Sequence, residues 1–200
     1  MEAKQQALVL MGIKHCGKST QGRLLSAHFA CPFYDTDAVI EAMTGKTPRE
    51  LYTHGGEGAF MAAEADACSR IVATLSARAA AQPFSAVIAT GGGICNNSAA
   101  LKILHAIGTF VFLNTDESVA ADRIVREVGI ENDGSLTNLP AYIAKEKPRS
   151  IPDVRAAFHR FFVARVALYQ NLADITVPLA PATPEANMNA LLSALALLRV

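Results

Sequence analysis

Residues 12–19 have a spacing that is suited to holding phosphate. They read Gly12-Ile-Lys-His-Cys-Gly17-Lys18-Ser19, which fits the pattern G-x-x-x-x-G-K-[ST]. An apolar run precedes the motif and a helical periodicity follows it, so backbone N–H groups at a helix N-terminus can surround phosphate oxygens. Lys18 is expected to reach the β- and γ-phosphates of ATP, and the Ser19 hydroxyl to bind Mg²⁺. The alternative is a chance glycine turn before a helix, which the complete motif in this context disfavours.

Four further residues in or beside this loop are assigned to the ATP site by position: Lys14, His15, Cys16 and Thr20. Thr20 is expected to make an additional phosphate contact. Lys14 and His15 either touch phosphate or are solvated loop side chains, and the second interpretation is favoured. Cys16 lies beside the phosphates at the start of the predicted helix, and a small loop-filling role is favoured over redox sensing.

Two carboxylates follow the second predicted strand. Asp35 and Asp37 are two residues apart, and at the period of a strand they point the same way. Phosphoryl transfer needs one group to hold the hydration shell of Mg²⁺ and another to accept a hydroxyl proton. The alternative is that Asp37 only caps the next helix. Beside a phosphate loop, the catalytic interpretation is favoured.

The pattern along the chain alternates short apolar runs with helical periodicity. It predicts an α/β fold with five parallel strands covered by helices on both faces, in three layers. Ligands bind such sheets beyond the carboxyl ends of the strands, where every glycine-rich turn falls here. A segment at 129–151 without clear periodicity is expected to be a mobile lid. The predicted strands are 7–11, 33–36, 85–89, 109–113 and 174–177, and the predicted helices are 18–30, 37–43, 48–53, 57–81, 99–106, 117–128, 152–173 and 184–198.

The composition excludes several classes of protein. The 200 residues are 51% hydrophobic and 18% charged, which argues against disorder and predicts one domain, 1–200. The net charge of zero gives no basic excess for nucleic acid or an anionic membrane. We find no signal peptide and no apolar run of membrane-spanning length. Four cysteines without metal-binding spacing favour reduced thiols and a cytoplasmic location.

With these motifs in order, the sequence resembles the shikimate kinases, a branch of the phosphate-loop kinases, over about residues 8–185. Residues 12–20 resemble that family's phosphate loop, and 33–37 its D-[ST]-D strand end. The segment 40–46 resembles its I-E-x-x-T-G, and Gly56 to Glu64 its G-E-x-x-F-R-x-x-E. Residues 89–93 resemble its triple-glycine strand end, and 165–169 its R-x-P-L-Y.

The resemblance implies an ATP- and Mg²⁺-dependent kinase of a small hydroxylated acid, with shikimate to 3-phosphoshikimate, in aromatic amino acid biosynthesis, as the leading reaction. It implies that Asp35 supports magnesium and that Asp37 binds the substrate hydroxyls and acts as the base. We expect a monomer or weak dimer that acts on a small molecule and needs no nucleic acid or membrane, although the sequence does not give the oligomeric state. The resemblance further implies that the backbone of Gly91, Gly92 and Gly93 contacts the substrate. It implies that Arg123 stacks on adenine and that the turn at Pro184 lies beside adenine. Arg165 matches the arginine that binds the substrate carboxylate and reaches toward the transferred phosphate.

Two arginines of that family are missing. Met61 stands where the family has the arginine that grips the shikimate carboxylate, and Glu64, which would hold that arginine, is present without it. The lid arginine has Lys147 as its favoured counterpart, although lysine is a point charge rather than a bidentate fork. The lid is also longer, and Ala167 replaces a proline. Candidate replacement cations are His54, Arg49, Arg149, Arg155 and Arg160, among which the sequence does not choose.

Two further functions therefore remain open at this point. One is the same phosphoryl transfer to a different small alcohol or hydroxy acid, with Met61 marking a changed pocket. The other is a nucleotide-binding regulator without turnover, which the intact Lys18, Ser19, Asp35 and Asp37 argue against.

Overall fold

The computed structural model describes residues 7–76 and 83–197 of the chain. Its centre is a parallel sheet of five strands in the order β2-β3-β1-β4-β7. All five residues of β1 are buried, as expected of a parallel strand covered on both faces. Beyond the sheet, two short antiparallel strands pair with each other. The strands are β1 (Ala7–Met11), β2 (Phe33–Asp35), β3 (Val87–Ala89), β4 (Gly108–Thr115), β5 (Gly129–Ile130), β6 (Leu136–Thr137) and β7 (Ile175–Leu179).

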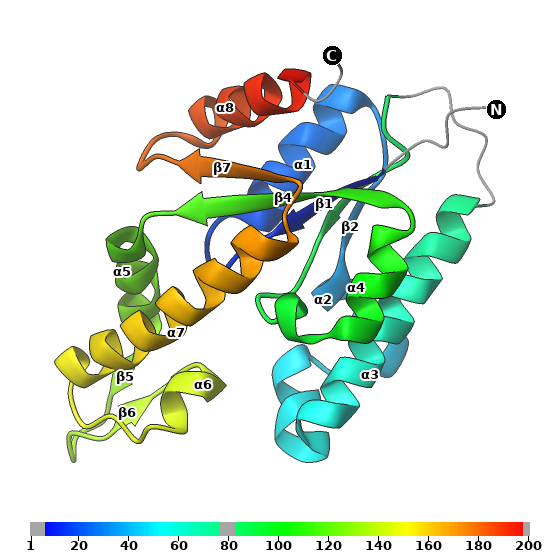
Figure 1. Ribbon diagram of the computed structural model, residues 1–200. Coiled ribbons are helices and arrows are strands. Elements are labelled where there is room, and N and C mark those ends of the chain that lie inside the picture. The colour runs from blue at the N-terminus through cyan, green and yellow to red at the C-terminus, as the bar shows by residue number, and fades with distance from the viewer. Residues whose placement is uncertain (1–6, 77–82, 198–200) are drawn as a thin grey trace.

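Helices lie on both faces of the central sheet, so the three-layer α/β/α prediction is confirmed (Figure 1). One layer holds α1 and α8, which pack on each other, and the opposite layer holds α3, α4, α5 and α7. The helices are α1 (Lys18–Phe29), α2 (Thr36–Thr44), α3 (Pro48–Ser76), α4 (Ser98–His105), α5 (Glu117–Glu127), α6 (Ala141–Ala144), α7 (Ile151–Leu172) and α8 (Pro184–Ala196), with a 3₁₀ turn η1 (Ile94–Asn96).

The predicted boundaries of the elements are partly confirmed by the structure. The second strand ends at Asp35, and Thr36 already belongs to α2, because the Asp35 side chain caps that helix. The break predicted between the helices at 48–53 and 57–81 is confirmed: α3 consists of two helical segments that meet at a kink, where Gly56 has non-helical backbone (φ 73°). A positive φ is readily adopted by glycine, so the chain can leave one helical segment and enter the next at this residue. The predicted end of this helix, 77–81, and Leu198 of the last helix lie outside the described residues.

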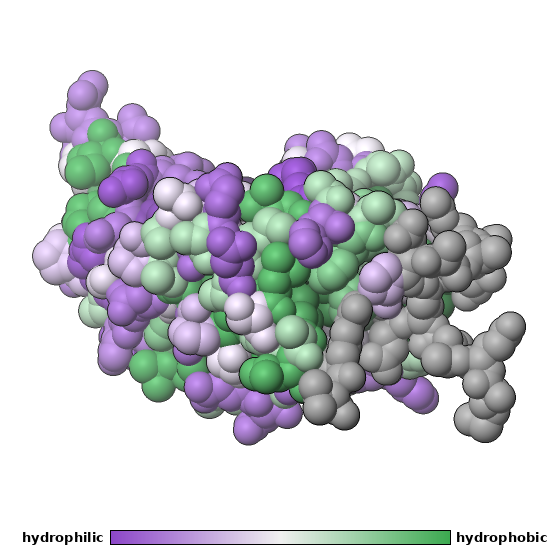
Figure 2. All heavy atoms as spheres, turned by 90° about the horizontal axis from the view of Figure 1, so that it is seen from above, coloured by the Kyte–Doolittle hydropathy of each residue, from purple (hydrophilic) through white to green (hydrophobic). Residues whose placement is uncertain are grey.

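The predicted lid is not an irregular loop. Residues 129–150 contain β5, β6 and α6, and Ile143 of α6 is fully buried in the hydrophobic core. Tyr142 stacks on Phe161 of α7 with ring centroids 3.7 Å apart. The exposed residues of this segment are mostly polar, although Ile130 is also exposed. Figure 2 shows the molecule from above, with hydrophilic and apolar side chains mixed at its left end. A few apolar anchors therefore hold a segment whose remaining surface is largely polar.

Candidate active site

The phosphate loop connects β1 to α1, and two of its glycines are required by its geometry. Gly12 has φ 151°, and a Cβ there would lie 2.7 Å from Cys16 Sγ and 2.9 Å from the Leu113 carbonyl oxygen. Gly17 has φ 100° and precedes the first turn of α1. The buried Lys18 ammonium donates to the carbonyl oxygens of Gly12 (2.9 Å) and Ile13 (2.8 Å). The Lys18 ammonium therefore holds a positive charge inside the phosphate loop, next to the N-terminus of α1.

A hydrogen bond to Asp35, the last residue of β2, connects this strand to the start of α1 directly after the phosphate loop. Ser19 Oγ donates to Asp35 Oδ2 at 2.6 Å, and Asp35 Oδ1 accepts from the backbone N–H of Asp37 at 3.1 Å. Asp35, rather than Asp37, is thus the helix cap, so the capping interpretation of Asp37 is wrong. Hydroxyl and carboxylate oxygens are ligands that Mg²⁺ prefers. Among the described residues no cluster of three His, Cys, Asp or Glu side chains could hold a metal, so such an ion would need phosphate oxygens or water as further ligands.

The Asp37 side chain is free to act because its neighbour does the capping. Its Oδ1 is buried and has no hydrogen-bond partner. Burial, and then the charge of Asp35, raise the pKa of Asp37, while Lys18 and Lys14 oppose the shift. A carboxylate with a raised pKa is a better proton acceptor than an exposed one.

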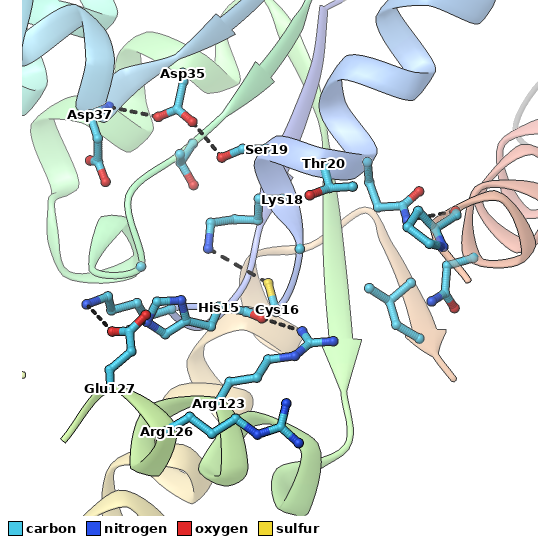
Figure 3. A pocket seen from close by; sticks show the side chains of 18 of the residues that line it. His15, Cys16, Lys18, Ser19, Thr20, Asp35, Asp37, Arg123, Arg126 and Glu127 are labelled. Carbon is cyan, nitrogen blue, oxygen red and sulfur yellow. Dashed lines mark hydrogen bonds and ion pairs between the residues drawn. The ribbon is translucent and has the colours of Figure 1, made fainter. Parts of the chain in front are cut away.

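These groups line one cavity of about 650 Å³. Figure 3 shows Asp37 and Lys18 extending into the same space, with Arg123 and Arg126 entering from α5. Arg123 Nη1 donates to the His15 carbonyl oxygen, and Glu127 of α5 lies 3.2 Å from His15 Nε2 and 3.8 Å from Lys14 Nζ. Helix α5 therefore holds the phosphate loop from the side opposite α1.

The cavity unites most of the residues assigned to ATP and magnesium from the sequence. At its far end it reaches the turn between β7 and α8. The predicted residues that line it are Lys14, His15, Cys16, Gly17, Lys18, Ser19, Thr20, Asp35, Asp37, Gly92, Arg123 and Pro184. The lining residues not predicted from the sequence are Gln21, Thr90, Arg126, Glu127, Leu179, Ala182 and Asn187.

Two of the lining residues that were not predicted could have been found from their spacing in the sequence. Arg126 and Glu127 lie three and four positions after Arg123, so helical spacing places them on the same face of α5. Gln21 follows the phosphate motif in the first turn of α1, and its Nε2 donates to the Pro184 carbonyl oxygen at 2.9 Å. Nothing in the sequence marks that contact, because it joins segments 163 residues apart.

Six predicted residues do not line this cavity: Gly12, Met61, Gly91, Gly93, Lys147 and Arg165. Lys147 is exposed, with φ 52°, just beyond α6. Arg165 Nη1 contacts Cys95 Sγ at 2.7 Å, and its guanidinium stacks over Phe161. The Gly91 N–H already donates to Thr36 Oγ1 at 3.0 Å, so the predicted backbone contacts to substrate fall to Gly92 and Gly93.

Close to Met61 lies the buried carboxyl of Glu64, without the arginine that the family resemblance places at position 61. Asn97 Nδ2 donates to Glu64 Oε2 at 2.9 Å and to the Met61 carbonyl oxygen at 2.8 Å. Burial, and to a lesser degree Asp37, raise the pKa of Glu64 to about 7, while the Asn97 hydrogen bond and Arg165 oppose this. With methionine at 61, no guanidinium at that position keeps Glu64 ionised.

Since the cavity joins a phosphate loop to the unpaired carboxylate of Asp37, its geometry is that of a nucleotide-dependent phosphotransferase. A protein-family model described as shikimate kinase matches residues 14–196. The shikimate kinase of Symbiobacterium thermophilum is 33% identical over 173 residues, covering 84% of this chain and 92% of that protein. Shikimate kinase 1, chloroplastic, of Arabidopsis thaliana is 31% identical over 183 residues, covering 86% and 57%. The chain belongs to the shikimate kinase family.

Solved structures agree with this assignment of the fold. The shikimate kinase from Acinetobacter baumannii in complex with shikimate superposes with a TM-score of 0.73 at 22% identity, covering 96% of this chain and 93% of that one. The shikimate kinase from Aquifex aeolicus gives a TM-score of 0.67 at 25% identity, covering 96% of both chains. In the part of the chain that the structure describes, no helix is long and apolar enough to cross a membrane.

Proposed function

We propose that this protein transfers the γ-phosphate of ATP to a hydroxyl of shikimate, giving 3-phosphoshikimate and ADP. The observation that carries the proposal is the Asp37 carboxylate, which is free of the helix cap and lines the same cavity as the phosphate loop. Membership of the shikimate kinase family supports the same reaction. The product is an intermediate of aromatic amino acid biosynthesis in that family.

The chain's own residues account for the transfer. Asp37 accepts the proton of the acceptor hydroxyl while the hydroxyl oxygen forms a bond to the γ-phosphorus of ATP. The bond between the γ-phosphorus and the oxygen that bridges it to the β-phosphate breaks, and ADP leaves. Lys18 turns from the loop carbonyls to the phosphates and stabilises their developing charge. Arg165 binds the acceptor carboxylate, for which it leaves its contact with Cys95.

Ser19 and Asp35 fit a magnesium ion, since their oxygens lie 2.6 Å apart beside the phosphate loop. A Mg²⁺ ion bound by them supplies charge neutralisation on the phosphate oxygens. Arg123 and Pro184 flank the base of ATP in this proposal, and Lys147 adds a cation when the lid moves. A monomer or weak dimer remains part of the proposal. A cytoplasmic location is also part of it, and four free, buried cysteines support that location.

The test is ADP release from Mg·ATP by the purified protein, first with shikimate and then with a panel of small hydroxy acids and polyols. We expect turnover with shikimate, and a fall of roughly 10²–10⁴-fold in kcat for Asp37→Asn, because that range is typical when a general base is removed. The fold of the variant is checked by thermal unfolding. Unchanged turnover in Asp37→Asn would contradict the role of this carboxylate.

Met61 favours one second candidate, the same transfer to a different small alcohol. Loss of a bidentate arginine–carboxylate contact weakens binding, so an acceptor without a carboxylate at that point is compatible with methionine. ADP release with another acceptor, and none with shikimate, would establish this alternative. Nucleotide binding without turnover on any acceptor would favour a regulator instead.

A further inference from the structure

Glu64 is a buried carboxyl group that the proposed reaction does not use. It lies on α3 and is only 1% exposed. Its Oε2 accepts a hydrogen bond from Asn97, but its Oε1 is buried and has no hydrogen-bond partner. A buried carboxylate oxygen without a donor is strongly destabilising, so this oxygen needs an explanation.

Asp37 Oδ1 is a second buried oxygen without a hydrogen-bond partner, and it lies beside Gly91, as Glu64 Oε1 does. A Cβ placed on Gly91 would lie 2.9 Å from Glu64 Oε1 and 3.0 Å from Asp37 Oδ1. The two oxygens therefore flank Gly91 closely, and both are closed to solvent. An ionised carboxylate can only accept hydrogen bonds, whereas a protonated one can also donate. A proton on Glu64 Oε1 would make that oxygen a donor, and Asp37 Oδ1, beside the same glycine, is an acceptor without a partner.

We propose that Glu64 is a positioning residue: its protonated carboxyl donates a hydrogen bond to Asp37 Oδ1 and leaves Asp37 Oδ2 to face the acceptor hydroxyl. The proposal rests on the proposed function only in the role it gives to Asp37. A neutral hydrogen bond thereby takes the place of an ion pair between Glu64 and an arginine at position 61. Fixing one oxygen of the base fixes the direction from which the other accepts a proton.

The groups around Glu64 are consistent with a bound proton. Asp37 faces it from α2 and disfavours a second negative charge, whereas Arg165 from α7 favours one. Cys68, one turn further along α3, is a neutral thiol because burial, and then Glu64, raise its pKa to about 12. Asn97 donates to Oε2, so Oε1 is the oxygen left to carry the proton. Burial, the largest of these influences, raises the pKa of Glu64 to about 7.

The first test compares Glu64→Gln with Glu64→Leu, and uses Asp66→Asn, an exposed change on the same helix, as the control. Glutamine keeps the shape and a donor, so kcat should stay within about threefold of the unchanged protein. Leucine has no donor, and kcat should fall about 10²-fold with a smaller change in KM, as expected of a misplaced catalytic group. Glutamine as damaging as leucine would overturn the proposal.

The pH profile separates positioning from a merely structural role. In the unchanged protein kcat should fall as the pH rises above about 7, since loss of the Glu64 proton sets two ionised carboxyls against each other. Glu64→Gln cannot lose a proton there, so its profile should lack that decline. The same decline in both proteins would overturn the proposal.

A spectroscopic measurement keeps the inference independent of the proposed function. The infrared difference spectrum between the unchanged protein and Glu64→Gln, recorded at a pH below 7, should contain the C=O band of a protonated carboxylic acid. This band is expected whichever acceptor is used, and also if Glu64→Leu does not fold. If the band is absent, the proposal that Glu64 is protonated is overturned, even where kinase activity is present. If the band is present but there is no turnover with shikimate, the proposed function fails and the inference about Glu64 stands.

Discussion

Asp35 and Asp37 do different work because the chain turns from strand to helix between them. Asp35 uses one oxygen to cap α2 and the other to accept from Ser19, so both of its oxygens are engaged. Asp37 lies in the first turn of the helix, and its carboxylate remains free in the cavity. The division of roles follows from the cap, which holds the first carboxylate against the backbone of the second.

Met61→Arg should place a cation at the position where the resemblance puts the arginine for the acceptor carboxylate. Arginine at this position lies one helical turn before Glu64, and the pair would ionise because each stabilises the charge of the other. If the acceptor is shikimate, its carboxylate gains a bidentate donor, and we expect KM for shikimate to fall about tenfold with KM for ATP unchanged. Met61→Leu, which adds no charge, is the control. An unchanged KM in Met61→Arg would mean that no carboxylate binds beside this residue.

Glu64 should also make stability depend on pH. Its pKa is raised from 4.5 to about 7, so the folded protein keeps a proton that the unfolded chain loses. The free energy of unfolding should therefore fall as the pH rises from about 4.5 to 7, by about 3 kcal/mol, and be independent of this group above that range. Denaturant unfolding across this range measures the slope. Glu64→Gln should lack this contribution, and equal slopes in both proteins would refute it.

At the scale of elements, α5 acts on the phosphate loop through Glu127. This carboxylate lies beside Lys14 and His15, and it lines the cavity that the triphosphate is proposed to enter. Glu127→Gln should lower KM for ATP by about two- to fivefold, because it removes a like charge near the phosphates, and the effect should shrink at high salt. Steady-state kinetics at two salt concentrations test this, with Glu131→Gln in the lid as the control. A raised KM would instead show that Glu127 is needed to hold the loop.

The sequence predicted the elements best where one local rule sufficed. The apolar run of β1, the glycine spacing at 12–17 and the placement of the motifs directly after predicted strands needed no information from distant residues. The position of Arg165 on α7 was predicted as well, but its contact was not. Phe161, one turn earlier, and Cys95 from another segment decide where the guanidinium lies.

The errors lie where distant segments decide the local structure. Nothing within residues 129–151 shows that Tyr142 stacks on Phe161 or that Ile143 enters the core, so the segment was predicted as an irregular loop. Its mobility, and the extent of the single domain, remain predictions. The disfavoured alternative of Asp37 as a cap is wrong because Asp35 occupies the N-cap position, immediately before Thr36, whereas Asp37 already lies in the first turn of α2.

At the scale of the whole molecule, the lid is bonded to α3, which lies far away in the sequence. Lys145 Nζ donates to Tyr52 Oη at 2.7 Å, and Arg49 Nη1 donates to Asn138 Oδ1 at 2.9 Å. Asn138 also donates to the Glu127 carbonyl oxygen at 2.8 Å. The lid is thereby connected both to the helix that carries Glu64 and to the helix that holds the phosphate loop, so its motion is expected to affect both ends of the site.

Tyr52→Phe tests whether the contact between α3 and the lid holds the lid in place. The variant removes the hydroxyl but keeps the ring over which Lys145 Nζ lies, 5.3 Å from the centroid. One exposed hydrogen bond contributes about 0.5–1 kcal/mol, so amide exchange at residues 136–145 should speed up about two- to fivefold. ATP hydrolysis without acceptor should rise by a similar factor, because a looser lid admits water. Tyr34→Phe on β2 is the matched control, and exchange and hydrolysis that change no more in Tyr52→Phe than in this control would mean that the apolar anchors alone hold the lid.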